Sequence, residues 1–90
     1  MFIYNVILYN RFDSQFHEYS HKLFKNFDDA KKYVKTYLEE SSRIFRDNNF
    51  RYCENDYEYG NQVYMVTMEH DIYYNNIVKE KIKIHKERVY

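Results

Sequence analysis

The chain has 90 residues, with 14 Lys and Arg balancing 14 Asp and Glu, and with 12 Tyr and 7 Phe but one Gly, one Cys, no Pro and no Trp. A chain of this length forms one small domain with a single modest core, and its 21% aromatic content is untypical of disordered proteins. Its formal net charge of zero argues against a uniformly basic nucleic-acid coat or a polybasic membrane binder. No apolar run approaches the roughly 20 residues that span a bilayer. We expect a single domain over residues 1–90.

The amino-acid composition also indicates what kind of genome encodes the protein and in which cellular compartment it works. Asn, Lys, Ile, Tyr and Phe, which have AT-rich codons, are abundant, whereas Gly60 is the only glycine and Ala30 the only alanine. This bias predicts a gene from an AT-rich genome, such as that of a low-GC bacterium, its phage or plasmid, or a large DNA virus. Residues 1–9 are too short and lack the basic flank of a signal peptide. Because the lone Cys53 has no partner for an intrachain disulfide, we expect a cytoplasmic protein of the host cell.

Two strands are predicted before the first helix. Residues 2–9 are dominated by β-branched and aromatic side chains at both parities, which is typical of a central strand covered on at least one face. Turn-forming residues follow at positions 10–14. The alternation in residues 16–24 predicts a half-buried strand antiparallel to the first. Its odd positions are His17, Tyr19, His21 and Leu23.

A helix is predicted from Asn26 onward. The Asn26 side chain can accept a hydrogen bond from the backbone N–H of Asp29, and acidic residues in the first turn complement the helix dipole. Apolar and small residues then recur at helical spacing, with charged residues outside. The predicted inner positions are Ala30, Val34, Tyr37, Leu38, Ser41 and Ile44 or Phe45. The helix is expected to end at residues 47–49, where an asparagine can take the left-handed conformation that glycine usually fills.

Three strand segments follow, over residues 50–59, 62–70 and 77–89. Gly60 and Asn61 join the first two as a two-residue hairpin turn, which places the only glycine where positive φ is needed. The predicted order is therefore β-β-α-β-β-β, an α+β fold with one helix packed on an antiparallel sheet.

The sequence carries no strong catalytic or metal-binding motif. A single glycine excludes the phosphate-binding loop, the dinucleotide fingerprint and the nucleophile elbow. His17 and His21 would lie about 13 Å apart on a strand, too far to share one metal ion. We predict that Cys53 is a buried structural thiol rather than a thiolate activated by a base such as His70. We therefore expect a protein that is not an enzyme, with no catalytic or metal-binding residues and no cofactor.

Neutrality hides a segregated charge distribution. Residues 52–78 contain acids but no Lys or Arg, whereas residues 79–90 are rich in bases. The acids are Glu54, Asp56, Glu58, Glu69 and Asp71, and the bases are Lys79, Lys81, Lys83, Lys86 and Arg88. The first three acids fall at alternate positions, on one face of the predicted strand, and their spacing of about 6.6 Å approximates that of phosphates along a nucleic-acid strand. The first three lysines form the reciprocal basic row.

Four interpretations of these two rows stay open. Both can be solvated faces that keep sheet edges from aggregating. The acidic row can meet a basic groove on a partner protein, or the basic row can contact nucleic-acid phosphates. The acidic row of one copy can also meet the basic row of another. Tyr57 and Tyr59 in the acidic hairpin, with Tyr73 and Tyr74 beside it, favour recognition because tyrosine is common at interface hot spots, although AT-rich codon usage explains the same enrichment.

A resemblance to known proteins lies in residues 23–34, which read LFKNFDDAKKYV. This segment resembles the strand-to-helix junction found in many small phage and plasmid accessory proteins. In its size, charge and lack of motifs the chain is also similar to anti-CRISPR and other anti-defence inhibitors. The resemblance implies a stoichiometric inhibitor that occupies a functional surface of a host effector, and it carries over no catalytic residue.

We therefore expect a phage or mobile-element protein that binds and inhibits a host macromolecule, such as a CRISPR or other defence effector. The residues expected to bind this partner are Glu54, Asp56, Tyr57, Glu58, Tyr59, Glu69 and Asp71. The alternative is a small nucleic-acid-binding module that uses the lysines of the helix and the basic C-terminal strand. Its binding residues would be Lys79, Lys81, Lys83, Lys86 and Arg88. A homo-oligomer is compatible with either function, and neither involves a membrane.

Overall fold

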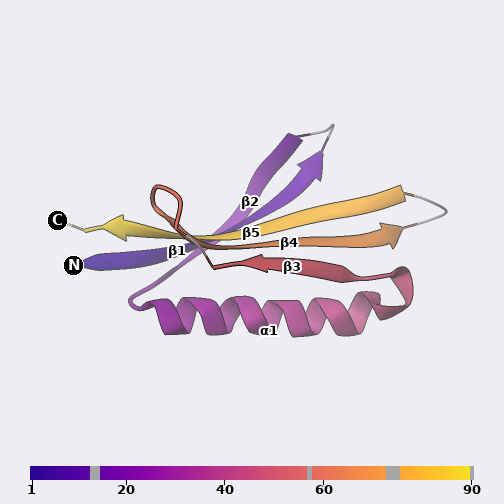
Figure 1. The fold of residues 1–90 in the computed structure, drawn as a ribbon, viewed down its shortest axis with the longest axis horizontal. Helices are drawn as coiled ribbons and strands as arrows, with labels where there is room; N and C mark the ends of the chain where they lie inside the picture. The colour runs from indigo at the N-terminus through magenta and orange to yellow at the C-terminus, as the bar shows by residue number, and fades with distance from the viewer. Residues whose placement is uncertain (13–14, 57, 73–75, 90) are drawn as a thin grey trace.

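The helix and strands follow the predicted order. A computed structural model describes residues 1–12, 15–56, 58–72 and 76–89, and Figure 1 shows their arrangement. The elements are β1 (Phe2–Phe12), β2 (Gln15–Phe24), α1 (Phe27–Phe45), the short 3₁₀ helix η1 (Arg46–Asn48), β3 (Arg51–Asn55), β4 (Gln62–Ile72) and β5 (Asn76–Arg88). The predicted α+β class, with one helix between the second and third strands, is confirmed.

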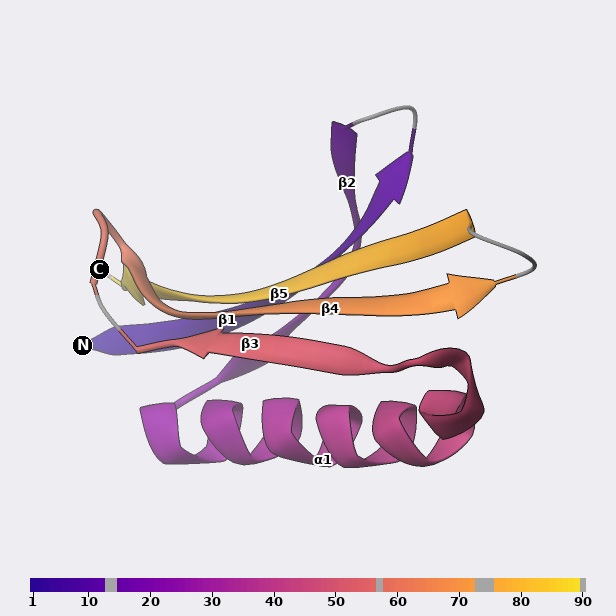
Figure 2. The ribbon, with the colours of Figure 1, turned by 45° about the vertical axis from the view of Figure 1, so that its right-hand side comes forward.

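All five strands form one antiparallel sheet in the order β2-β1-β5-β4-β3. The first and last strands pair from Phe2 opposite Arg88 to Asn10 opposite Glu80, so β5 is the middle strand and the two ends of the chain lie side by side (Figure 1). The edge strands are β2 and β3. Figures 1 and 2 show α1 connecting these two edges beneath the sheet.

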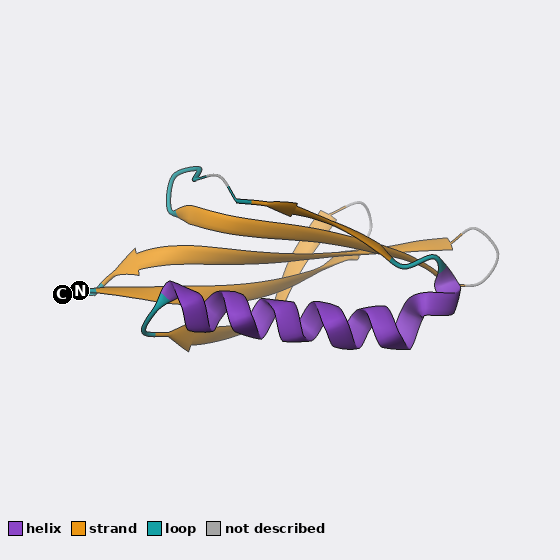
Figure 3. Cartoon of the chain, turned by 60° about the horizontal axis from the view of Figure 1, so that its bottom comes forward, coloured by secondary structure: helices purple, strands orange, loops and turns teal. Residues whose placement is uncertain are grey.

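The core lies between α1 and one face of the sheet, along which α1 runs in Figure 3. Alternate residues of the three central strands point into it, as the two-residue period of a strand requires. The buried side chains of this core cluster are Val6 and Leu8 of β1, Tyr64, Val66 and Met68 of β4, Ile82 and Ile84 of β5, and Ala30, Val34 and Leu38 of α1. No described helix covers the opposite face, where the intervening side chains of β1, β4 and β5 lie, among them Ile7, which is buried there at 7% exposure.

The ends of α1 match the sequence signals. Asn26 Oδ1 accepts a 2.9 Å hydrogen bond from the backbone N–H of Asp29, as expected of an N-cap. Asn49, which follows η1, takes the predicted left-handed conformation at φ 54°. Of the two alternatives for the last inner position, Ile44 is 69% exposed, whereas Phe45 stacks on the buried His70. Among the described residues, no helix is both long and apolar enough to cross a membrane.

The predicted hairpin turn is present, but the strand before it is shorter than predicted. Tyr59 and Gln62 exchange backbone hydrogen bonds of 2.9 and 3.0 Å, and Gly60 between them has φ of +61°. The prediction that the strand runs unbroken to Tyr59 is wrong, because β3 ends at Asn55. Asn55 pairs with Met65, so the bridge at Tyr59 and Gln62 is out of register by one residue and the ladder cannot continue regularly between them.

Two predictions about burial are also wrong. β2 is not half-buried: every residue before Phe24 is exposed, because β2 is an edge strand that has a neighbour on one side only. Cys53 is exposed rather than buried, because it lies on the other edge strand and points away from the core. In both cases the error is one of strand position and not of strand identity.

Candidate functional site: the uncovered face of the sheet

The middle strand carries three of the predicted basic residues on the uncovered face. Ile82 and Ile84 of β5 are buried in the core. The alternate positions, which are Lys79, Lys81 and Lys83, therefore point to the opposite face. Because β5 is central, this row runs along the middle of the face, so it cannot serve to protect a sheet edge.

Two of these lysines lie against aromatic rings from other strands. Lys81 Nζ is 4.0 Å from the centroid of the Phe16 ring of β2, and Lys83 Nζ is 5.6 Å from that of Tyr9 of β1. Both distances fall within the range of a cation–π contact. We call the surface formed by Tyr9, Phe16, Lys79, Lys81 and Lys83 the basic face.

The charges of the basic face are only partly compensated. Lys79 Nζ lies 3.6 Å from a carboxylate oxygen of Glu69, which also forms an ion pair with Arg51 at 2.9 Å. Lys81 and Lys83 have no carboxylate oxygen within 4.0 Å among the described residues. Burial, and then the neighbouring charge of Lys83, lowers the pKa of Lys81 from its ordinary value. An anion placed over this pair would relieve their repulsion.

A shallow depression of about 270 Å³ lies beside the lysine row. It is lined by Arg11 of β1, Phe16 of β2, Lys79, Glu80 and Lys81 of β5, and residues of β4 that include Glu69. Arg11 stands opposite Phe16 in the pairing of β1 with β2, which brings a further cation to the edge of the basic face.

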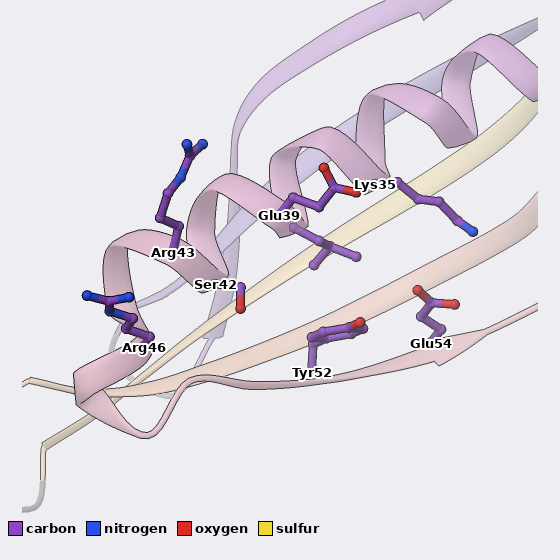
Figure 4. A pocket seen from close by; sticks show the side chains of 8 residues that line it. Lys35, Glu39, Ser42, Arg43, Arg46, Tyr52 and Glu54 are labelled. Carbon is purple, nitrogen blue, oxygen red and sulfur yellow. The ribbon is translucent and has the colours of Figure 1, made fainter.

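Glu54, the first residue of the predicted acidic row, lies on the helix side of the sheet. It lines a groove of about 570 Å³ between β3 and α1, shown in Figure 4. The other labelled residues of this groove are Tyr52 of β3 and Lys35, Glu39, Ser42, Arg43 and Arg46. Burial, followed by the charge of Glu54, raises the pKa of the nearby Tyr64 hydroxyl. In Figure 4 the guanidinium groups of Arg43 and Arg46 point away from Tyr52 and Glu54, so the groove does not present one cluster of like charges.

Asp56 and Glu58 line a second groove on the helix side, of about 380 Å³. Asp56 Oδ1 lies 3.4 Å from Lys31 Nζ of α1, so the charge of this acid is compensated within the chain. Tyr59, at the hairpin tip, is 77% exposed. Tyr57 lies outside the described residues.

Glu69 and Asp71 lie on the uncovered face, because the alternate positions Met68 and His70 are buried in the core. Asp71 Oδ2 accepts a 2.8 Å hydrogen bond from Asn49 Nδ2. The structure therefore does not bring the predicted partner-binding residues together: the hairpin acids face the helix side, and these two acids face the other side.

The structure separates the lysines of the helix from three of the basic residues of the C-terminal strand. α1 covers one face of the sheet, whereas Lys79, Lys81 and Lys83 point from the other. Lys86 is at an even position of β5, so its side chain points to the helix side of the sheet. There it lines the second groove beside Lys31. Its Nζ lies 4.2 Å from the Phe2 ring centroid. Arg88, two residues later, shares the parity of Lys86.

Among the described residues, no group of three His, Cys, Asp or Glu side chains could hold a metal ion. Cys53 is exposed on the uncovered face, whereas His70 is 3% exposed on the core face, with its ring 4.0 Å from that of Phe45. The sheet therefore separates the thiol from the base that the sequence offered as its partner.

Sequence reasoning does not single out Tyr9, Phe16 or Arg11. The sequence signal that could have identified them is that they are charged or aromatic residues on the first two predicted strands. Their relevance depends on the pairing of β1 with β5, which joins the two ends of the chain. The chain matches no protein-family profile, no curated protein and no solved structure.

Proposed function

We propose that the protein is a non-enzymatic binding protein whose basic face contacts the phosphates of a nucleic acid. The observation that supports this most is the pair Lys81 and Lys83, which lies at the middle of an uncovered sheet face and has no carboxylate partner among the described residues. Phosphate oxygens complement such ammonium groups, and phosphate contacts supply the largest sequence-independent part of nucleic-acid affinity.

The acidic residues support binding less strongly, because several already have partners within the chain. Asp56 pairs with Lys31, Glu69 pairs with Arg51, and Asp71 accepts a hydrogen bond from Asn49. A partner protein would have to replace these contacts before it gained from the acids. For this reason the basic face is the better candidate surface.

A phage or mobile-element inhibitor that binds a host defence effector stays the second candidate function. One observation favours it: Tyr59 is 77% exposed at the tip of the hairpin and is preceded by the exposed Glu58. An exposed aromatic ring beside a charge is typical of interface anchors. Binding there would leave the basic face free.

Fluorescence anisotropy with labelled single-stranded and duplex oligonucleotides of mixed sequence tests the first function. We expect saturable binding that weakens between about 50 and 200 mM salt, as counterion release requires. The double variant K81Q/K83Q should reduce the salt slope by about 1.4 to 1.8, since each phosphate contact contributes about 0.7 on single strands and 0.9 on duplexes.

The matched control is K25Q/K32Q, which makes the same change in charge at two exposed lysines outside the basic face. The proposal fails if no oligonucleotide binds at the lower salt concentration, or if this control loses as much affinity as K81Q/K83Q. The second candidate is tested by purification of tagged protein from a low-GC host with and without nuclease. A protein partner that resists nuclease and is lost in E58K/Y59A would replace the first function by the second.

A further inference from the structure

We propose that the nucleic acid bound by the basic face is single-stranded, with successive phosphates at Lys81 and Lys83 and with bases stacked on the rings of Phe16 and Tyr9. This inference rests on the proposed function and adds the class of ligand and the way in which it is held. Three features support it: the lysine pair, the two rings and the way in which a strand can lie on the face.

The lysine pair matches a row of phosphates in both charge and spacing. Lys81 and Lys83 are two residues apart on one strand, so their Cα atoms lie about 6.6 Å apart on one face. Neither has a carboxylate oxygen within 4.0 Å among the described residues, whereas Lys31 and Lys79 do. The lysines of the central row therefore hold positive charges next to each other, at a spacing close to that of phosphates along a strand.

The rings that contact these lysines are placed to stack on bases. Phe16 is 36% exposed and Tyr9 is partly exposed, and both belong to strands on the same side of β5. Each ring now lies against an ammonium group. When the ammonium moves to a phosphate, the face of the ring becomes available to a base, and alternating cations and rings are the usual means of holding single strands.

The two rings on this face favour a single strand over a duplex. No described helix lies on this face to enter a major groove, and what rises from it is the paired end of β1 and β2, on the side away from α1 (Figure 2). In a duplex the base faces are already stacked inside the helix and cannot reach Phe16 or Tyr9. A single strand can turn its bases onto the sheet and its phosphates onto the lysines, which uses both kinds of group at once.

Affinities for three labelled probes test this inference. The probes are an oligothymidine of about ten nucleotides, an oligomer of the same length made of abasic residues, and a blunt duplex; unlabelled inorganic polyphosphate serves as a competitor. We expect the oligothymidine to bind at least about tenfold more tightly than the abasic strand or the duplex. F16L should weaken oligothymidine binding by about fivefold or more and leave binding of the abasic strand unchanged. The matched control Y59L, which removes an exposed ring outside the basic face, should change neither.

A second variant keeps the test independent of any folding defect in F16L. The chain has no Trp, so F16W introduces a single tryptophan at the proposed stacking position, and its emission can be excited apart from that of the tyrosines. We expect oligothymidine to quench its emission and polyphosphate to leave it unchanged. Equal binding of all probes, no difference between F16L and Y59L, or no quenching in F16W would overturn the single-strand inference while phosphate binding stands. Absence of binding to every probe would overturn the proposed function as well.

Discussion

Lys81 Nζ of β5 lies 4.0 Å from the centroid of the Phe16 ring of β2, and its side chain reaches that ring across β1, which separates the two strands. A cation–π contact at such an exposed site contributes about 0.5–1 kcal/mol. The contact connects the exposed edge strand to the middle of the sheet. It also holds the Phe16 ring on the basic face, beside the lysines.

The repulsion within the lysine pair leads to a prediction about its titration. Burial is the larger cause of the lowered pKa of Lys81, and the charge of Lys83 is the second cause. In K83Q the second cause is removed, so we expect the pKa of Lys81 to rise toward its ordinary value of 10.5 without reaching it. NMR titration of the lysine side-chain carbons measures this shift. K32Q, which removes an exposed lysine from α1, should leave the titration of Lys81 unchanged, and a K83Q curve equal to that of the unmodified chain contradicts the prediction.

Local signals were sufficient to predict α1 and the turn at Gly60. The cap at Asn26, the left-handed Asn49 and the positive φ of Gly60 each depend on a few neighbouring residues, so the sequence contains what is needed to read them. The same holds for the parity of β5, because Ile82 and Ile84 predict which positions point away from the core.

Strand order could not be predicted from the sequence, because it depends on contacts between residues far apart in the chain. The pairing of β1 with β5 makes the C-terminal strand central, and this turns Lys81 from an edge residue into the middle of a face. The same pairing leaves β2 and β3 at the edges, which exposes Cys53. Only part of the candidate site could therefore be predicted. Its lysines follow from the sequence, whereas the proximity of Tyr9 and Phe16 to them depends on the assembled sheet.

Glu80 of β5 gives a prediction about stability and pH. Burial raises the pKa of this carboxyl from its ordinary value of 4.5, and His70 of β4 opposes the shift. Tyr19 of β2 and Tyr37 of α1, whose hydroxyl oxygens lie 3.1 Å apart, also interact with its charge. Because the folded-state pKa is raised, ionised Glu80 destabilises the fold at neutral pH, and this penalty disappears as the pH falls through the folded-state value toward 4.5.

We therefore expect E80Q to raise the melting temperature at neutral pH, and the gain should shrink as the pH falls below 4.5, where the carboxyl is protonated in both states. Thermal melts followed by circular dichroism across this range measure the difference. E40Q, at an exposed position of α1, is the control and should show no comparable gain. A gain for E80Q that is the same at every pH would point to packing instead of charge.

Gly60 gives a prediction about backbone strain. It has φ of +61°, and a Cβ built there would meet no heavy atom within 4 Å, so an alanine would be strained by its backbone alone and not by a clash. We expect G60A to lower the free energy of unfolding by roughly 1–2 kcal/mol, the cost of a left-handed conformation for a residue with a Cβ.

Urea denaturation of G60A, G60N and N61A separates strain from other effects of substitution in the turn. G60N should lose less than G60A, because asparagine tolerates the left-handed region. N61A should change little, because Asn61 does not have positive φ and contributes its backbone carbonyl, which accepts a hydrogen bond from Lys86 N–H at 2.8 Å. Equal stability of G60A and the unmodified chain would mean that the turn takes another conformation in solution.

The exposure of Cys53 predicts rapid chemical modification of the folded protein. As the only cysteine, it gives a signal that comes from one position. It lies on the edge strand β3, paired with Thr67 on its one neighbour, so a thiol reagent reaches it without unfolding of the sheet. We expect a disulfide reagent to label the native protein completely, at a rate within about an order of magnitude of that in denaturant. The labelled protein should keep its melting temperature, and C53S should give no signal. Labelling that requires denaturant would show that Cys53 is buried and would contradict the assignment of β3 as an edge strand.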